Sequence, residues 1–297
     1  SLRTYKNLPL RMRRRQKSVI DNFSQPMKKR LLGIAIMLMV ILLTSCEMLD
    51  VHPHSVHITG ARNVNAQNIR QIEELCAGKD TIRFVLTGDT QSWYDETCDM
   101  VRCVNSLGNV DFVVHGGDVS DYGMTEEFMM QRDIFQGFSC PFVTIIGNHD
   151  CLGTGEQAYE AIFGATNFTF KAGKVRFICL NTNAMDFGFP ENVPDLGYME
   201  KLLEESKSDS TWQYTVVSMH VQPATVVFNN KVMDQFEEYV RSYPKTLFCT
   251  AAHDHYLSAT DIFGDGIVYH RSTSMDDRTI TLITIMGGTY EYEYISF

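Results

Sequence analysis

The sequence has little positive charge over most of its length. Ten of its 26 Lys and Arg residues lie within residues 1–45, beside a single acidic residue, Asp21. The rest of the chain has 16 basic and 35 acidic side chains, which is a net charge of −19. Nonspecific binding of nucleic acid depends on contacts from Lys and Arg to phosphates, so we expect no nucleic-acid polymer as a partner. A small phosphorylated substrate remains compatible, because bound metal ions change the local sign of the charge.

The chain also lacks a hydrophobic run long enough for an ordinary transmembrane helix. Its main apolar stretch, Leu31–Leu43, has 13 residues and follows the basic stretch Met27–Arg30. A membrane-spanning helix needs about 20 apolar residues, whereas a signal-peptide core needs about 7 to 15. Residues 27–45 are therefore predicted to be a signal peptide, and residues 1–26 an upstream segment outside the mature protein.

The predicted signal ends in Leu43-Thr44-Ser45-Cys46, which resembles the bacterial lipobox. In that motif the signal is cut before the cysteine, and the cysteine carries lipid. We expect a lipidated Cys46, a tether over residues 46–62, and a location in the bacterial cell envelope, outside the cytoplasm. The membrane would then be a partner through the lipid. The alternative is an N-terminal anchor that is never cut.

No Cys-x-x-Cys pair occurs among the eight cysteines, and the chain has no internal repeat or low-complexity segment. Cys140, Cys179 and Cys249 lie in or beside apolar runs, where cysteine behaves as a small core residue. A disulfide outside the cytoplasm stays open. Because 44% of the residues are hydrophobic, which is typical of a globular protein, residues 63–297 are predicted to form one domain.

Helices and strands are expected to alternate from residue 63 onwards. Helices are expected at 63–76, 95–107, 125–138, 155–163, 196–207 and 231–242, and strands at 82–87, 111–115, 141–146, 213–218, 246–250, 266–270, 279–285 and 290–297. A hairpin is expected from 167–170 and 174–180, and a functional loop at 181–195. This pattern predicts an α/β (α+β mixed) domain with a mixed sheet or two packed sheets.

Five of the expected strands end in residues that commonly bind metals. The sequences at these ends are Gly88-Asp89-Thr90-Gln91, Gly116-Gly117-Asp118-Val119-Ser120-Asp121, Gly147-Asn148-His149-Asp150, Met219-His220 and Ala252-His253-Asp254-His255. Open α/β folds bind ligands at the carboxyl ends of their strands. We therefore expect these side chains to gather at one edge, with Asp118 in the middle of the set.

Seven of these residues are candidate metal ligands: Asp89, Gln91, Asp118, Asn148, His220, His253 and His255. Together they suit Mn, Fe, Zn, Ni or Co better than Ca or Mg, and seven is the right number for two ions that share one carboxylate. His253 and His255 are expected to point the same way, because alternate residues of an extended segment do. Taken alone, Asp89 could be a turn residue, and His149 or His220 a hydrogen-bonded histidine. The ordered set favours a two-metal site, which is suited to phosphoryl transfer.

This ordered set resembles the calcineurin-like metallophosphoesterase superfamily. The resemblance runs from about Ile82 to Tyr256, and its Gly-Asp-x-x-Asp and Gly-Asn-His-Asp blocks are specific. It implies a four-layer β-sandwich flanked by helices, with the metal site on loops at one edge of the sheets. It also implies hydrolysis of a phosphomonoester or a small phosphodiester by a hydroxide that bridges two metal ions.

The resemblance also implies a role for each site residue. One ion would be held by Asp89, Gln91, Asp118 and His255, and the other by Asp118, Asn148, His220 and His253. His149 would face the phosphate and protonate the leaving oxygen, held in place by Asp121. Asp150 would support the loop.

Three positions bear on how closely the chain follows the family pattern. Gln91 stands where many members have His, and its neutral amide oxygen is a weaker ligand, which leaves metal preference and occupancy open there. Ala252 replaces a usual Gly and adds only a methyl group. Tyr122 lies one residue beyond the position of the tyrosine ligand of purple acid phosphatases, so we expect no iron–tyrosinate colour.

The substrate is open at this stage. Trp93, Tyr94, Tyr122 and Phe187 could stack on a base or sugar, or could serve only in packing. The main hypothesis is a dinuclear metal-dependent phosphoesterase. One alternative is a lipid-anchored surface binding protein with this fold but little turnover, which weak metal binding at Gln91 would favour. The other is a mainly structural envelope protein.

Overall fold

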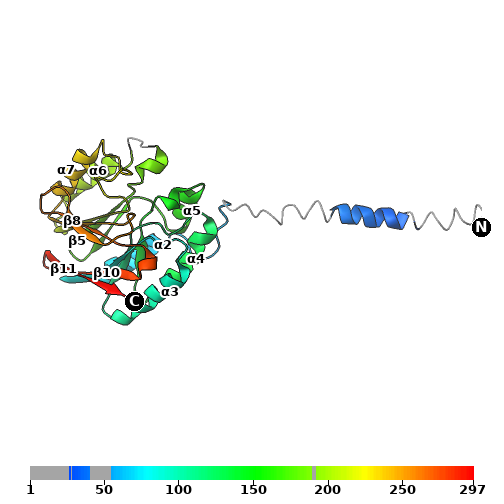
Figure 1. Ribbon diagram of the computed structural model, residues 1–297, viewed down its shortest axis with the longest axis horizontal. Helices are drawn as coiled ribbons and strands as arrows, with labels where there is room; N and C mark the ends of the chain where they lie inside the picture. Colours follow the sequence, from blue (N-terminus) through cyan, green and yellow to red (C-terminus); the bar gives the residue numbers. More distant parts are fainter. Residues whose placement is uncertain (1–26, 28, 41–54, 189–191) are drawn as a thin grey trace, which may run out of the picture. The chain divides into compact units, whose positions relative to one another are not determined.

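The computed structural model describes residues 27, 29–40, 55–188 and 192–297 (Figure 1). The chain divides into two units, residues 1–52 and 53–297. In the first unit, residues 29–40 are helical. Among the described residues, no helix has both the length and the apolar character needed to cross a membrane. Cys46, the predicted lipidation site, lies outside the described residues.

The second unit alternates helices and strands as the sequence predicts. Its α-helices are α2 (Val64–Leu75), α3 (Tyr94–Leu107), α4 (Thr125–Phe135), α5 (Gly155–Ile162), α6 (Leu196–Ser206) and α7 (Met233–Ser242). Its strands are β1 (Thr81–Thr87), β2 (Phe112–His115), β3 (Phe142–Thr144), β4 (Phe168–Ala172), β5 (Val175–Leu180), β6 (Tyr214–Met219), β7 (Thr246–Ala251), β8 (Ser258–Asp261), β9 (Val268–Arg271), β10 (Thr279–Met286) and β11 (Thr289–Ser296). Short 3-10 helices are η2 (His149–Cys151), η3 (Ala184–Phe187) and η4 (Met275–Asp277). The short strand β8 was not predicted from the sequence.

The strands form two mixed sheets. The first has the order β11-β10-β1-β2-β3, and the second the order β4-β5-β6-β7-β9-β8. Strands β1, β2 and β3 are parallel to one another, as are β5, β6, β7 and β9. In the first sheet the antiparallel strands β10 and β11 lie on one side of the parallel strands, and in the second sheet the antiparallel strands β4 and β8 lie at the two edges. Each sheet therefore has a group of adjacent parallel strands that all end on the same side.

The two sheets pack face to face, with helices on both outer faces. Successive side chains of a strand point to opposite faces. In β1, Phe84 and Leu86 belong to the core between the sheets, where Phe84 contacts Phe177 and Phe248. Val85 instead belongs to a core shared with α3, α4 and α5. A third core joins β6 and β7 to α6 and α7. The layers are thus helices, sheet, sheet, helices, which confirms the predicted four-layer sandwich (Figure 1).

Helix α2 closes the exposed edge of the first sheet at β3. Asn65 Nδ2 donates to the Thr144 carbonyl at 2.8 Å, and the Thr144 N–H donates to Asn65 Oδ1 at 3.0 Å. Asn68 Nδ2 donates to the Phe142 carbonyl at 2.7 Å. These side chains satisfy backbone groups that would otherwise be open to another strand. None of the seven cysteines in the described part of the chain forms a disulfide.

The folded body begins earlier than the sequence suggests. Residues 58–61 were assigned to the tether, but Ile58 is buried in the core shared with α4. The buried Arg132 of α4 donates to the carbonyls of Thr59 at 2.7 Å and Ala61 at 3.0 Å. The body therefore starts near residue 58 rather than residue 63. No local sequence pattern marks this start, because the partner residue Arg132 lies some 70 positions further along the chain.

Candidate metal centre

The predicted ligands come together where the parallel strands end. The ligand atoms of Asp118, His220 and His253 all lie within 4.8 Å of one another, and so do those of Asp89, Asp118 and His255. We call the first set, together with Asn148, the buried group. We call the second set, together with Gln91, the outer group. Asp118 belongs to both, which is the arrangement that a carboxylate shared between two ions requires.

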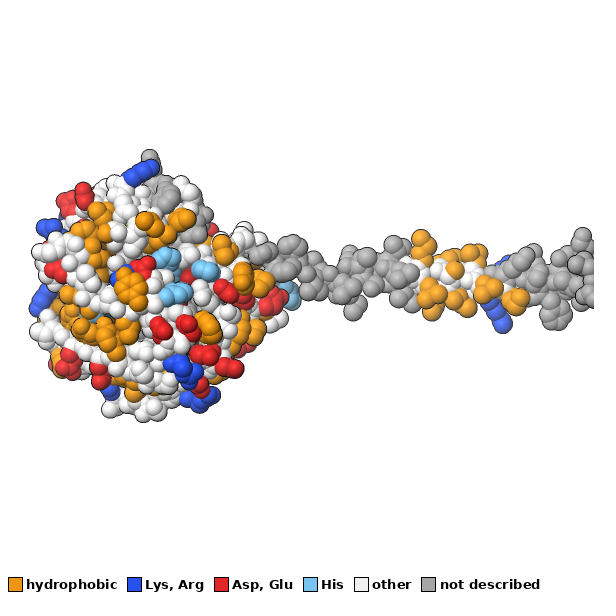
Figure 2. All heavy atoms as spheres, in the orientation of Figure 1, with side chains coloured by type: hydrophobic (Ala, Val, Ile, Leu, Met, Phe, Trp, Pro, Cys, Tyr) orange, Lys and Arg blue, Asp and Glu red, His pale blue; other side chains and the backbone are white. Residues whose placement is uncertain are grey.

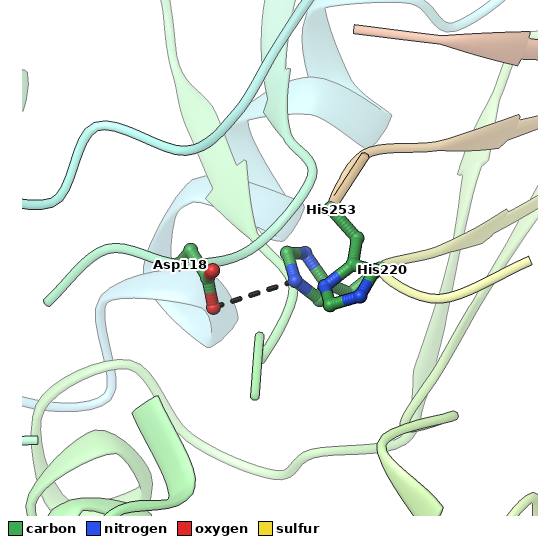
Figure 3. A group of neighbouring side chains, drawn as sticks. All are labelled: Asp118, His220 and His253. Carbon is green, nitrogen blue, oxygen red and sulfur yellow. Dashed lines mark ion pairs between the residues drawn. The ribbon is translucent and has the colours of Figure 1, made fainter. Parts of the chain in front are cut away.

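Asn148 lies between the two histidines of the buried group. His220 Nε2 is 3.4 Å from Asp118 Oδ1 and 3.0 Å from Asn148 Oδ1. His253 Nδ1 is 2.8 Å from the same Asn148 oxygen. Figure 3 shows the rings of His220 and His253 side by side, with the Asp118 carboxylate facing them. Two imidazole nitrogens, a carboxylate and an amide oxygen thus converge on one small region.

Hydrogen bonding directs one nitrogen of His220 toward this region. His220 Nδ1 lies 2.9 Å from the Gly116 carbonyl, to which it donates, so Nε2 is the atom that faces Asp118. Burial would lower the pKa of His220, but Asp118 and Asp89 outweigh it and raise that pKa to about 9. Burial, together with His220, lowers the pKa of His253 to about 4. Without a metal ion the buried group therefore has a charged His220 and a neutral His253.

The outer group contains a buried oxygen that lacks a partner. Asp89 is fully buried, and its Oδ1 makes no hydrogen bond to any part of the chain that the structure describes. His255 Nε2 lies 3.4 Å from this oxygen. Burial raises the pKa of Asp89, because an ionised carboxylate is costly without compensation. A bound cation would supply that compensation, so the residues present fit a metal ion.

Gln91 is held beside the shared carboxylate. Its Nε2 donates to Asp118 Oδ2 at 3.4 Å, and its main-chain N–H donates to the Asp118 carbonyl at 3.1 Å. Gln131 Nε2 donates to the Gln91 carbonyl at 2.8 Å. A half-turn of the terminal amide would present its oxygen instead. Gln91 is therefore placed to serve as a neutral ligand of the outer group.

Five of the seven predicted ligands adopt left-handed backbone conformations. Their φ angles are 50° at Asp89, 39° at Gln91, 56° at Asp118, 74° at His253 and 55° at His255. Such conformations are uncommon outside glycine and concentrate at functional sites, where the surrounding structure enforces them. The expectation that residues 253–255 are extended is wrong. Left-handed turns there place His253 in the buried group and His255 in the outer group.

Two glycines allow the ligand loops to approach each other closely. A Cβ atom on Gly147 would lie 2.1 Å from Asp118 Oδ1, and one on Gly117 would lie 2.5 Å from His220 Nδ1. The methyl group of Ala252 fits because its neighbours Gly88 and Gly116 are also glycines, and a Cβ on either would lie 3.1 Å from it. The extra methyl group thus costs no space at this edge.

His149 lies beside the two groups without belonging to either. Its main-chain N–H donates to Asp118 Oδ1 at 2.9 Å. Its ring Nδ1 lies 2.7 Å from the carbonyl oxygen of Asp121 and 3.5 Å from the Asp121 carboxylate. The nearer partner of the ring is therefore the Asp121 main chain, whereas the sequence had suggested the side chain. His149 is about one-third exposed, so its ring is accessible to a substrate.

A protein-family model described as calcineurin-like phosphoesterase matches residues 82–257, which is more than half of the chain. The chain belongs to the calcineurin-like phosphoesterase family. In general terms, membership indicates metal-dependent hydrolysis of phosphoesters. No curated protein matches the chain by sequence.

Solved structures share the fold of this phosphoesterase at low identity. A dimetal phosphatase from Danio rerio is 13% identical, with a TM-score of 0.55 over 73% of this chain and 99% of that one. Purple acid phosphatase PPD1 from yellow lupin (Lupinus luteus) seeds is 13% identical, with a TM-score of 0.55 over 74% of this chain and 52% of that one. GAP50, described as the anchor in the inner membrane complex of Plasmodium, is 11% identical, with a TM-score of 0.57 over 73% and 85%. These likenesses show the fold alone.

Asp150 holds the ligand loops of the phosphoesterase together. Its fully buried carboxylate accepts hydrogen bonds from the main-chain N–H groups of Val119, Ser120 and Gly147 at 2.8 to 3.2 Å. The Ser120 hydroxyl adds a fourth hydrogen bond at 2.9 Å. These bonds join the loop that carries Asp118 to the loop that carries Asn148. Asp150 therefore fixes the positions of the ligand loops without being a candidate ligand itself.

Arg271 fixes the loop with the last two histidines, and the sequence analysis missed it. This buried residue of β9 forms an ion pair with Asp254 and a hydrogen bond to the Tyr256 hydroxyl. Its guanidinium carbon lies 3.9 Å from the centre of the Tyr256 ring, and its Nε donates to Ser258 Oγ at 2.7 Å. No motif marks Arg271. The sequence signal that could have found Arg271 is its position directly after the expected strand 266–270, since the ends of the other expected strands carry the site residues.

His115 is a second missed residue, at the end of β2. The Gly117 N–H donates to its Nδ1 at 3.3 Å, so Nε2 carries the proton and donates to the Thr90 hydroxyl at 3.0 Å. Burial lowers the pKa of His115 to about 3. It is therefore a neutral residue that connects the first two ligand loops.

Proposed function

We propose that this protein hydrolyses phosphoester bonds with a dinuclear metal centre. The observation that carries the proposal is the membership of Asp118 in two ligand groups, each with its ligand atoms within 4.8 Å. The buried group would hold one ion, and the outer group the other. The unpartnered Asp89 oxygen supports the proposal, because a cation would satisfy it. Two such ions, when bound, supply Lewis acidity and lower the pKa of water.

His149 is proposed as the general acid. Its Nδ1 proton is committed to the Asp121 carbonyl, so Nε2 is the atom that can give a proton to the leaving oxygen. Asp121 accepts a hydrogen bond from Ser92 Oγ at 3.3 Å, which helps to hold its loop. The Asp121 carboxylate lies 3.5 Å from Nδ1 and would help to hold the ring in place.

We further propose that the protein acts in the bacterial cell envelope, anchored by a lipid on Cys46. The lipobox-like sequence before Cys46 supports this location. The substrate would be a small phosphoester, since the acidic body disfavours nucleic-acid polymers. Globomycin, which blocks lipoprotein signal cleavage, tests the anchor. Accumulation of the uncut chain is expected, and normal maturation would contradict it.

Turnover by the purified protein tests the enzymatic proposal. The protein would be stripped of metal, reloaded with Mn, Zn, Ni or Mg, and assayed with a phosphomonoester and a phosphodiester chromogenic substrate. We expect metal-dependent hydrolysis that is lost in both Asp118→Asn and His149→Ala. Two ions bound without turnover of either ester would contradict catalysis. No bound metal would contradict the dinuclear centre itself.

A binding function without turnover is the second candidate. The structural likeness to GAP50, which is described as an anchor, is compatible with this candidate. The neutral Gln91 in the outer group favours this candidate, because it weakens one of the two ion sites. Metal binding that is retained by a chain without hydrolytic activity would support it.

A further inference from the structure

Large hydrophobic side chains are exposed on six of the seven loops that follow the parallel strands at the ligand edge. These loops follow β1, β2, β3, β5, β6 and β7 and contain, in that order, Trp93, Tyr122, Leu152, Met185, Val226 and Tyr256. Among the described side chains, each of these six is between 38% and 89% exposed. We call them the apolar rim. Figure 2 shows hydrophobic side chains on both sides of a central group of histidines on this face.

Three members of the apolar rim lie next to groups proposed to act on the substrate. Tyr122 follows Asp121, whose carbonyl accepts from His149. Tyr256 follows His255 directly in the sequence, and the Leu152 N–H donates to the His149 carbonyl at 3.3 Å. Apolar side chains gathered around one site expose surface that favours an apolar ligand.

Parts of the rim are held in place before any ligand arrives. The Tyr256 ring stacks on the guanidinium of Arg271, with the guanidinium carbon 3.9 Å from the ring centre. The Tyr122 N–H donates to Glu127 Oε2 at 3.0 Å. A surface that is already ordered loses little conformational freedom on binding. This favours a role in ligand binding over a chance exposure of loop residues.

The same six loops carry almost no Lys or Arg. Their sequences, residues 88–93, 116–124, 145–154, 181–195, 220–232 and 252–257, contain Lys231 alone. The loop after β9, residues 272–278, adds Arg278, which forms an ion pair with Asp99. The nearby Arg271 is already paired with Asp254. Recognition of phosphate groups away from a metal centre relies on Arg and Lys. The site is therefore equipped for one phosphate, at the metal centre, and poorly equipped for others.

We propose that the substrate is an ester of a single phosphate with a large apolar alcohol, whose apolar part lies against the apolar rim. The inference rests on the phosphoesterase function proposed above and names its substrate class. The scarcity of Lys and Arg in these loops disfavours nucleoside triphosphates and other polyphosphorylated compounds.

Three alkyl esters with equally poor leaving groups test the proposal in the metal-loaded, full-length protein. They are ethyl phosphate, octyl phosphate below its micelle concentration, and the bisphosphate of octane-1,8-diol. We expect kcat/KM for octyl phosphate to exceed that for ethyl phosphate by at least about tenfold, as burial of several methylene groups implies. A second phosphate at the far end should remove most of that gain.

Variants of the rim locate the effect. Tyr122→Ser combined with Val226→Ser should lower the octyl-to-ethyl ratio of kcat/KM by at least about fivefold. The matched control is Met130→Ser, an exposed methionine on α4, which should leave the ratio unchanged. Equal turnover of ethyl and octyl phosphate, or a ratio that the rim variant does not change, would overturn the proposed substrate class. Absence of turnover with all esters would instead overturn the phosphoesterase function.

Discussion

The two ligand groups share Asp118 but differ in how firmly they are built. In the buried group, His220 is fully buried, its Nδ1 is fixed by the Gly116 carbonyl, and Asn148 contacts both histidines. In the outer group, the side chain of His255 is 44% exposed, and Gln91 supplies only a neutral amide.

This difference indicates that the two ions would bind unequally. Ligands that are oriented by hydrogen bonds to their other atoms bind metals more tightly, typically by about 10- to 100-fold. The buried group has such support at His220. The outer group depends on the half-exposed His255 and on the neutral amide of Gln91. We expect the buried group to fill first, and the outer group to set the metal concentration needed for activity.

The largest effect is expected from removal of the shared carboxylate. Asp118→Asn should release both ions and lower turnover by at least about 10³-fold, because a neutral amide cannot bridge two cations. Metal content per chain and hydrolysis rate measure the two effects. Asp99→Asn, a change of the same type on α3 away from the site, is the control. One ion retained at full affinity in Asp118→Asn would show that the carboxylate is not shared.

The next largest effect is expected from removing one histidine from each ligand group, which separates the contributions of the two groups. His220→Ala should remove the tighter ion and lower activity by about 10² to 10³-fold at every metal concentration. His255→Ala should remove only the weaker ion, so that activity returns when the metal concentration is raised. Calorimetric titration of each variant gives the number of sites and their affinities. Identical titrations for the two variants would contradict the difference between the groups.

Loosening of the loop that carries both histidines should weaken both groups together. Arg271→Met removes the ion pair to Asp254 and the contact with Tyr256, and we expect metal affinity to fall by about tenfold or more at each site. Arg271→Lys keeps the charge but not the planar fork, and should recover only part of the loss. Arg278→Met, at a half-exposed arginine on another loop, is the control. Affinity unchanged in Arg271→Met would mean that β9 does not position the histidines.

Proton competition at the buried group predicts a dependence on pH. The pKa of His220 is raised to about 9 in the metal-free protein, so at lower pH its proton must leave before the ion binds. Affinity of the tighter ion should fall by about tenfold for each pH unit below 9 and level off above it. Calorimetry in two buffers of different ionisation enthalpy would detect the released proton. Affinity that stays constant between pH 6.5 and 8.5 would rule out this competition.

The sequence predicted the elements of the site better than their arrangement. The strand ends were recognisable because Asp89, Asp118 and His220 each follow an apolar run, and the four-layer fold followed from the family resemblance. The division of His253 and His255 between two groups was not predictable, because it depends on left-handed turns that non-glycine residues seldom adopt. The role of Arg271 was hidden for another reason, since its partners come from a different loop and are brought close only by the fold.

The smallest effect is expected from Gln91→His. This substitution tests most directly why the outer group binds its ion weakly. An imidazole nitrogen is a better ligand than an amide oxygen for Mn, Zn or Ni, so the metal concentration for half-maximal activity should fall by about fivefold. The affinity of the buried group should change less, because Gln91 is linked to that group through the shared Asp118. Gln131 would still be available to hold the carbonyl at this position, as it does in the native chain. If the substitution leaves the metal requirement unchanged, residue 91 does not contribute to the outer ion, and the weakness of that group must come from the exposure of His255 instead.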